Sequence, residues 1–424
     1  MGLYIKKNGA LVQVAVSNKA IKSEGEKTVA LDMSNGDQIV EPSGQIQVFT
    51  KVTVQKPDTM VPGNIKKDVV IGGVTGTYQA EDMLPYRISD KGSYSVIDNS
   101  ITSVKKYAFY YDSQLTSFSS TSLTTLSTYS FYRCDNLTTV NIPSVTIISD
   151  YAFGYSGLTS FDFTNVTEIK NGAFQNCASL TSISLPNTIT TLPNAAFSSC
   201  SNLQNVYVPN VATLGGNDFA YSKITEVTDA MFPNTTRTGY ASFQNCSSLT
   251  TVNNTKLTYL SQSVFGYCAN LVTVNLPNVT YSGGFCFDND TSLTTLSLPE
   301  MTEISGNGIC RDCSSLVSVY FPKASTWLGN DHFSGCTSLQ IVDMGTRNKI
   351  QYSSFSSSVH SVTDIYLRKT GSVCTLSGTS TSFIPYYNQT INIHVPSDLI
   401  ASYQTASNWV TLYNDGKVTF VAIS

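Results

Sequence analysis

A phenylalanine returns about every 22 positions through the middle of this 424-residue chain. The series is Phe109, Phe131, Phe153, Phe174, Phe197, Phe219, Phe243, Phe265, Phe287, Phe333 and Phe355, with Cys310 in the one vacant place. Twelve units of about 22 residues therefore fill roughly residues 95–370. A period of this length indicates a stack of similar units, because a single unit has no partner for its apolar face and must bury it against its neighbour.

Each unit also carries residues at fixed offsets from its phenylalanine. A leucine follows after six residues, another apolar residue after nine and often a proline after twelve, as in Leu180, Ile183 and Pro186. Segment 182–185 alternates serine with an apolar residue, which is the period of a short β-strand. The strand is expected to end at Pro186, because proline has no N–H to continue the ladder. We therefore predict a mainly β solenoid with one short parallel strand in each repeat.

The stretch 171–186 resembles the BspA-like branch of leucine-rich repeats. It has an Ala-Phe pair, a cysteine three residues later, a leucine three after that, and an apolar strand that ends at proline. Repetition over twelve units makes the resemblance specific, and it covers about two-thirds of the chain. It implies a leucine-rich-repeat solenoid. The units of Phe153 and Phe219 lack the cysteine and are one residue shorter before the apolar anchor, so we expect local bends there.

The repeating phenylalanines are expected to stack as a ladder in the core, and we call their place in each unit the ladder position. Seven cysteines share one place in the repeat, three residues after the ladder position: Cys134, Cys177, Cys200, Cys246, Cys268, Cys313 and Cys336. A metal or redox row is one interpretation, but a small, weakly polar residue in a tight buried corner is favoured. Cys310 replaces the ladder phenylalanine, which accounts for the only Cys-x-x-Cys. His332, His360 and His394 are scattered and share no unit with an acid–nucleophile pair. We expect no catalytic, cofactor or metal site, and hence no enzyme.

The strand residues that alternate with the core are expected to face the concave side of the solenoid. The candidate binding face comprises Asn141, Asp162, Tyr207, Asn275, Tyr320, Asp343 and Tyr366. Amides, carboxylates and tyrosines bind sugars or protein loops by hydrogen bonding and stacking. A solubilising face without a ligand is an equal alternative, because any such solenoid needs a polar face.

Charge and hydropathy restrict the partners. Charged residues make up 13% of the chain, the net charge is −4 and no basic tract occurs, so we expect no capture of nucleic acid or of anionic membranes. No apolar run approaches the ~18 residues of a membrane span, and the first residues lack the apolar core of a secretory signal. We therefore expect no membrane insertion. We expect the protein to be made and assembled in a cytoplasm.

The two ends depart from the repeat. Residues 1–82 are expected to form a β-rich anchoring domain, with a hairpin turn in the segment 72–77, and residues 83–370 the solenoid. The stretch 51–78, with Val-x-Val-x-Lys-Pro followed by Asn-Ile-Lys-Lys, resembles a segment of tail and other virion structural proteins of phages of gut bacteria. Residues 371–424 are expected to form a C-terminal cap, since 391–409 is similar to the element that closes BspA-like arrays and covers the last sheet edge.

These resemblances imply a non-enzymatic virion protein of the tail, baseplate or head. It would attach to other virion proteins through residues 1–82 and present its repeat arc, in several copies, to a host-surface glycan or protein. The alternative is a bacterial cell-surface adhesin of BspA-like type, which predicts a signal peptide. A third alternative is a structural spacer without a ligand.

Overall fold

The computed structural model describes residues 93–350, 355, 359–376, 390–407 and 409–423, together with the backbone of six short strands before residue 93. The chain forms two compact units, residues 1–145 and 146–424. Most of the predicted anchor, including most of the phage-like stretch 51–78, lies outside the described residues. The boundaries at residues 82 and 370 therefore stay predictions.

The first unit contains three antiparallel strand pairs and the first repeats. The pairs are β1 (Leu3–Lys7) with β2 (Ala10–Val14), β3 (Ile39–Val40) with β4 (Ile46–Gln47), and β5 (Val70–Ile71) with β6 (Val74–Thr75). Pairing of Ile71 with Val74 confirms the hairpin predicted in the segment 72–77. In the repeats, β7 (Tyr94–Ile97), β9 (Leu115–Ser119) and β11 (Thr139–Asn141) form one parallel sheet, and β8 (Ser103–Val104) pairs with β10 (Thr125–Leu126).

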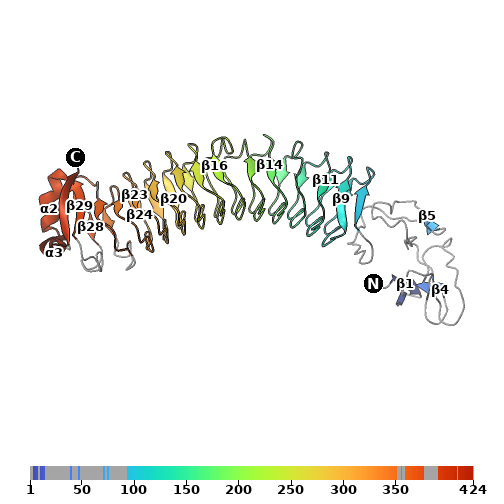
Figure 1. Cartoon of the computed structure of the whole chain (residues 1–424). Helices are drawn as coiled ribbons and strands as arrows, with labels where there is room; N and C mark the ends of the chain where they lie inside the picture. The colour runs from blue at the N-terminus through green and yellow to red at the C-terminus, as the bar shows by residue number, and fades with distance from the viewer. Residues whose placement is uncertain are drawn as a thin grey trace. The chain divides into compact units, whose positions relative to one another are not determined.

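The second unit is a solenoid whose successive turns lie side by side, as Figure 1 shows from β14 to β29. Its longer strands are β14 (Ser182–Ser184), β15 (Asn205–Tyr207), β16 (Glu226–Thr228), β17 (Thr251–Asn253), β19 (Thr273–Asn275), β21 (Thr295–Ser297), β23 (Ser318–Tyr320), β25 (Ile341–Asp343), β27 (Asp364–Tyr366), β29 (Ile391–Pro396) and β30 (Val418–Ile423). The mainly β solenoid of parallel strands is confirmed, with about 13 turns in the chain where twelve were predicted.

A second series of short strands lies where the repeat carries an aliphatic residue before the phenylalanine. These strands are β12 (Ile147–Ile148), β13 (Glu168–Ile169), β18 (Tyr259–Leu260), β20 (Tyr281–Gly283), β22 (Glu303–Ser305), β24 (Thr326–Trp327), β26 (Lys349–Ile350) and β28 (Thr375–Leu376). The sequence analysis predicted one strand in each repeat and did not predict these. Two or three residues are too few to display an alternating pattern, so only the pairing between turns defines them.

The repeating phenylalanines form the predicted ladder in the core. In the second unit, rings from Phe153 to Phe287 stack in series, with neighbouring ring centroids 5.4–6.0 Å apart. In the first unit, the rings of Phe109 and Phe131 stack at 5.0 Å. All of these rings are buried. The apolar face of each turn is thus covered by its neighbour, which is why the period is maintained over so many residues.

Tight corners flank each ladder position. Residues two before and two after it adopt left-handed backbone angles, as at Asn217 (φ 58°) and Tyr221 (φ 60°) around Phe219. These corners turn the backbone so that the ladder residue bonds to the next turn, and Phe219 N–H donates to Ser242 O at 2.9 Å. Asn and Gly tolerate this conformation best, yet several turns place tyrosine there, so stacking between turns must outweigh the local strain.

The cysteine row makes hydrogen bonds to the backbone. Each thiol donates to the carbonyl of the ladder residue one turn earlier, as in Cys177 to Phe153 O (3.1 Å) and Cys313 to Phe287 O (2.8 Å). All ten cysteines are buried and free of disulfides. The corner-filling interpretation is therefore incomplete, because the thiol also adds a second donor to a buried carbonyl; Phe153 O, for example, already accepts from Ser156 N–H at 3.0 Å.

The C-terminal element contains β29, a 3-10 turn η4 (Ser397–Leu399), α2 (Ile400–Thr405), α3 (Trp409–Asn414) and β30. The strand, the helical segment opening at Ser397 and the last strand follow the predicted order. Within this element β29 pairs with β27 and β30 pairs with β29, so its two strands cover the edge that β27 would otherwise leave open. Buried Tyr403 and Trp409 both form hydrogen bonds with the backbone of Cys374, which holds the helical segment against the core. Neither helix is long and apolar enough to cross a bilayer.

Candidate functional site

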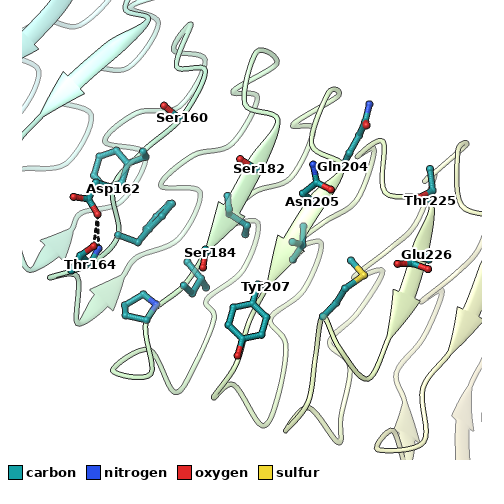
Figure 2. A pocket seen from close by; sticks show the side chains of 17 residues that line it. Ser160, Asp162, Thr164, Ser182, Ser184, Gln204, Asn205, Tyr207, Thr225 and Glu226 are labelled. Carbon is teal, nitrogen blue, oxygen red and sulfur yellow. Dashed lines mark hydrogen bonds between the residues drawn. The ribbon is translucent and has the colours of Figure 1, made fainter.

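An open groove of about 780 Å³ lies on the second unit across β14, β15 and the start of β16. Figure 2 shows Ser182 and Ser184 on β14 beside Asn205 and Tyr207 on β15. These four side chains form the floor, since strand residues alternate between the core and the exposed face. Ile183 and Val206, between them, are buried.

Breaks in the sheet create the groove. Residues 158–163 form no strand on one side of β14. On the other side, β15 pairs with β14 alone, and β16 belongs to a separate sheet with β17 and β19. After Tyr207 the backbone turns away, and Val208 N–H donates to Met231 O at 2.9 Å. Both breaks occur in the units of Phe153 and Phe219, whose shortened sequences predicted local bends. The two bends border the β14–β15 pair on either side.

The walls of the groove carry carboxylates and aromatic rings. Asp162 and Glu226 are exposed on opposite sides, and Tyr207 is 45% exposed on the floor. Asp162 accepts hydrogen bonds from the backbone N–H and the hydroxyl of Thr164, at 2.9 and 2.6 Å. These bonds hold the pKa of Asp162 below its usual value. None of the residues that line the groove is basic.

This arrangement suits recognition of a polar ligand. The exposed ring of Tyr207 offers an apolar face, while Ser, Asn, Gln and Thr side chains around it both donate and accept hydrogen bonds. The two carboxylates add strong acceptors. No group of three or more His, Cys, Asp or Glu residues in the described part of the chain has the geometry to hold a metal ion.

Three other predicted site residues gather on neighbouring strands near the C-terminus. Tyr320, Asp343 and Tyr366 lie directly opposite one another on β23, β25 and β27. Asp343 was predicted to be exposed, and this is wrong: it is 1% exposed and pairs with Arg368, whose Nε lies 2.7 Å from its Oδ2. Burial raises the pKa of Asp343 against the lowering effect of Arg368. The aspartate is buried and paired, so it is not part of an accessible surface.

His394 completes this C-terminal group. Its ring stacks on Tyr366 with centroids 4.1 Å apart, and its Nε2 lies 2.7 Å from Oδ1 of Asp364. The sequence analysis found no acid–nucleophile pair in the unit of His394, and it did not predict the contacts of His394 with Asp364 and Tyr366. Asp364 and His394 are 30 positions apart in the chain. They meet because β27 and β29 pair in register, which places Tyr366 opposite His394.

The remaining candidates, Asn141 and Asn275, line neither the groove nor the C-terminal group. Asn141 on β11 is exposed and donates to the hydroxyl of Ser119 at 3.3 Å, within the first unit. Asn275 on β19 is exposed and donates to Oδ1 of Asn253 at 2.8 Å. The structure therefore places only Asp162 and Tyr207 in the groove. Gln204, Asn205 and Glu226 were missed, although their position beside the predicted strands was a usable signal.

Comparison with known protein families agrees with this architecture. The model of the BspA type leucine rich repeat region matches in six copies, over residues 90–159, 124–250 and 236–362. These matches extend over more than half of the chain. The chain belongs to the BspA-type leucine-rich repeat family. Proteins built from these repeats are generally binding proteins without enzymatic activity.

Solved structures with a similar fold come from several bacteria. A leucine-rich repeat protein from Bacteroides ovatus is 22% identical, with a TM-score of 0.40, covering 62% of this chain and 82% of that one. A leucine rich cell surface protein from Faecalibacterium prausnitzii is 21% identical, with a TM-score of 0.46, covering 68% and 86%. The pneumococcal vaccine antigen PcpA is 15% identical, with a TM-score of 0.49, covering 80% and 91%. No curated protein matches the sequence.

Proposed function

We propose that this BspA-type repeat protein is a non-catalytic recognition protein, and that its groove binds a neutral glycan on a cell surface. The exposure of Tyr207 in the middle of a polar, open groove is the observation that carries this proposal. A solubilising face gains nothing from a large exposed ring, whereas a sugar packs its C–H face on such a ring.

The charges of the groove narrow the ligand class. Asp162 and Glu226 are positioned to accept hydrogen bonds from sugar hydroxyls. With no basic residue in the lining, a uronic acid, sialic acid or phosphate-bearing glycan would meet only like charge. A neutral glycan is therefore favoured over an anionic one. A protein loop is the alternative ligand, and it would bind through the same hydrogen-bonding groups.

A matched pair of tyrosine variants tests this proposal. Tyr207→Ala should weaken binding to neutral glycans at least about tenfold, which corresponds to loss of one stacking contact. Tyr240→Ala is the control, because Tyr240 is similarly exposed (49%) and does not line the groove. Glycan arrays would identify the ligand and calorimetry would measure the affinity. Equal binding by both variants would contradict the groove as the site, and binding only to proteins would select the alternative.

The cellular setting is a second part of the proposal. The resemblance of segment 51–78 to phage virion proteins supports one setting, a virion protein of the tail, baseplate or head. In this setting residues 1–82 attach the chain to other virion proteins. Family membership fits a bacterial cell-surface adhesin equally well. In either setting several copies would act together, so a weak single-site affinity suffices through multivalency.

Immunogold labelling separates the two settings. An antibody against residues 100–370 should label purified phage particles if the protein belongs to the virion. If the antibody labels intact bacterial cells and leaves the particles unlabelled, the virion hypothesis is rejected and the cell-surface adhesin is supported. If Tyr207→Ala particles or cells attach to the host normally, the protein acts as a structural spacer instead.

A further inference from the structure

Two successive turns near the C-terminus of the solenoid depart from the repeat at three buried positions. Arg347 lies eight residues before the ladder residue Phe355, where other turns carry Val166, Ile189, Val211, Leu257 and Val279. Trp327 pairs with Ile304 in the column of short strands and takes an aliphatic place. His332 directly precedes Phe333, where other turns carry a small or apolar residue such as Ala173 or Val264.

The three side chains surround one another in the core. The guanidinium carbon of Arg347 lies 4.6 Å from the centre of the Trp327 ring. The ring of His332 stands edge-on to Trp327, with centroids 5.2 Å apart. Arg347 is 2% exposed, His332 1% and Trp327 5%. Three departures from an apolar repeat, all buried and in mutual contact, are a cluster and not three independent substitutions.

The polar atoms of this cluster lack acceptors. Arg347 donates from Nε to the carbonyl of Lys349 at 2.7 Å, but its Nη1 has no hydrogen-bond partner among the described residues. The indole Nε1 of Trp327 also has none there, and the ring nitrogens of His332 form no hydrogen bond of normal geometry with a described residue, although the backbone of Gly329 interacts with the ring. No described carboxylate forms an ion pair with Arg347. A buried guanidinium without a counter-charge is strongly unfavourable, and the face of Trp327 offsets only part of that cost.

The chemistry of the cluster selects the missing partner. Burial and the charge of Arg347 lower the pKa of His332 to about 4, so its ring is neutral at pH 7. The cluster then offers N–H donors from Arg347, Trp327 and His332 against a single ring-nitrogen acceptor. A metal cation would be repelled by Arg347. Water would leave the guanidinium charge uncompensated.

We propose that a small anion of halide size is bound in the core between these two turns, accepting hydrogen bonds from Arg347 Nη1 and Trp327 Nε1 beside His332. The burial of all three side chains excludes a larger ligand. The ion supplies the acceptor and the counter-charge that Arg347 lacks among the described residues, and it links folding of the C-terminal turns to the anion. This inference is independent of the glycan groove.

Crystals of the unmodified protein test the site directly. In crystals grown or soaked in sodium bromide, we expect an anomalous bromide peak within hydrogen-bonding distance of Arg347 Nη1. A cluster filled by water alone, or a peak only at the protein surface, would overturn the proposal. This experiment needs no variant, so it stands even if substitutions in the core prevent folding.

Urea unfolding provides the second test. Chloride is exchanged for gluconate at constant ionic strength, and the fluorescence of the chain's two tryptophans, Trp327 and Trp409, reports the transition. Above saturation, each tenfold rise in chloride should raise the folded-to-unfolded ratio about tenfold. Arg347→Met should abolish this dependence. Arg237→Met is the control, because it removes an exposed arginine that also lies over an aromatic ring, that of Tyr259. Equal chloride dependence in wild type and Arg347→Met would disprove the site.

Discussion

The groove and the C-terminal strands both carry aspartate and tyrosine at strand positions of the repeat. These side chains are exposed in the groove and have partners within the protein on the C-terminal strands. On β23 to β29 the register is unbroken, and polar residues have partners within the protein: buried Asp343 pairs with Arg368, and Tyr366 stacks on the opposed His394. Around the groove the sheet is interrupted, and Asp162 and Tyr207 face solvent. Continuous register satisfies polar side chains within the protein, whereas interruption leaves them for a ligand.

Removing one partner of the buried ion pair should show this contrast most strongly. Arg368→Met leaves Asp343 buried without its counter-charge, and we expect a loss of about 2–4 kcal/mol in the free energy of unfolding, measured with urea. Asp162→Asn, in the groove, should change it by less than about 0.5 kcal/mol, because Asp162 is exposed. Similar losses in the two variants would remove the distinction between the regions.

The core between the two regions offers a stabilising variant. Asp290 occupies the place of the cysteine row after Phe287, is fully buried, and its Oδ2 has no partner among the described residues. Asp290→Cys restores the thiol that other turns donate to a carbonyl, as Cys268 does to Phe243 O. We expect a gain of about 1–3 kcal/mol at pH 7, measured by urea unfolding.

The pH dependence of this variant has a definite sign. Burial raises the pKa of Asp290 well above its usual value. Between the unfolded pKa of about 4 and the folded pKa, the folded state therefore binds more protons, and stability falls as the pH rises. Asp290→Cys should flatten this slope. A variant whose stability falls as steeply as that of the wild type would show that Asp290 is not the source.

Alanine substitution of the two tyrosines should separate stability from binding. Tyr366→Ala loses the stack on His394 and should cost about 1 kcal/mol, with little effect on ligand affinity. Tyr207→Ala should show the reverse, because its ring is exposed. Parallel urea unfolding and calorimetry would measure both, and a loss of affinity in Tyr366→Ala would move the binding site to the C-terminal strands.

The smallest expected effect is an acid transition in the C-terminal group. Burial tends to raise the pKa of Asp364, but hydrogen bonds from His394, Thr363 and Asn392 outweigh it and lower the pKa. A lowered pKa gives stability that is present above about pH 4 and lost as the pH falls through the folded value. Asp364→Asn should cost about 1 kcal/mol at pH 6 and nothing near pH 2. A constant difference across this range would exclude ionisation as the cause.

Sequence patterns predicted the repeating parts of the molecule well. The phenylalanine, leucine and cysteine positions predicted the parallel solenoid, because each turn must present the same apolar surface to its neighbour. The shortened units of Phe153 and Phe219 predicted local bends, and the sheet is interrupted in these two units, which the sequence analysis did not predict. Strand alternation placed Tyr207 on the exposed face, and the same reasoning failed for Asp343, since alternation gives the direction of a side chain but not what covers it.

The amino-acid sequence by itself determined the period, the ladder and the family, because those depend on local spacing that recurs in every turn. Only the tertiary structure decided which side chains meet between turns: Arg368 over Asp343, His394 beside Asp364, and Arg347 with His332 around Trp327. These contacts join residues about 5 to 30 positions apart in the chain. They depend on the register between turns and on local burial, which no single repeat encodes.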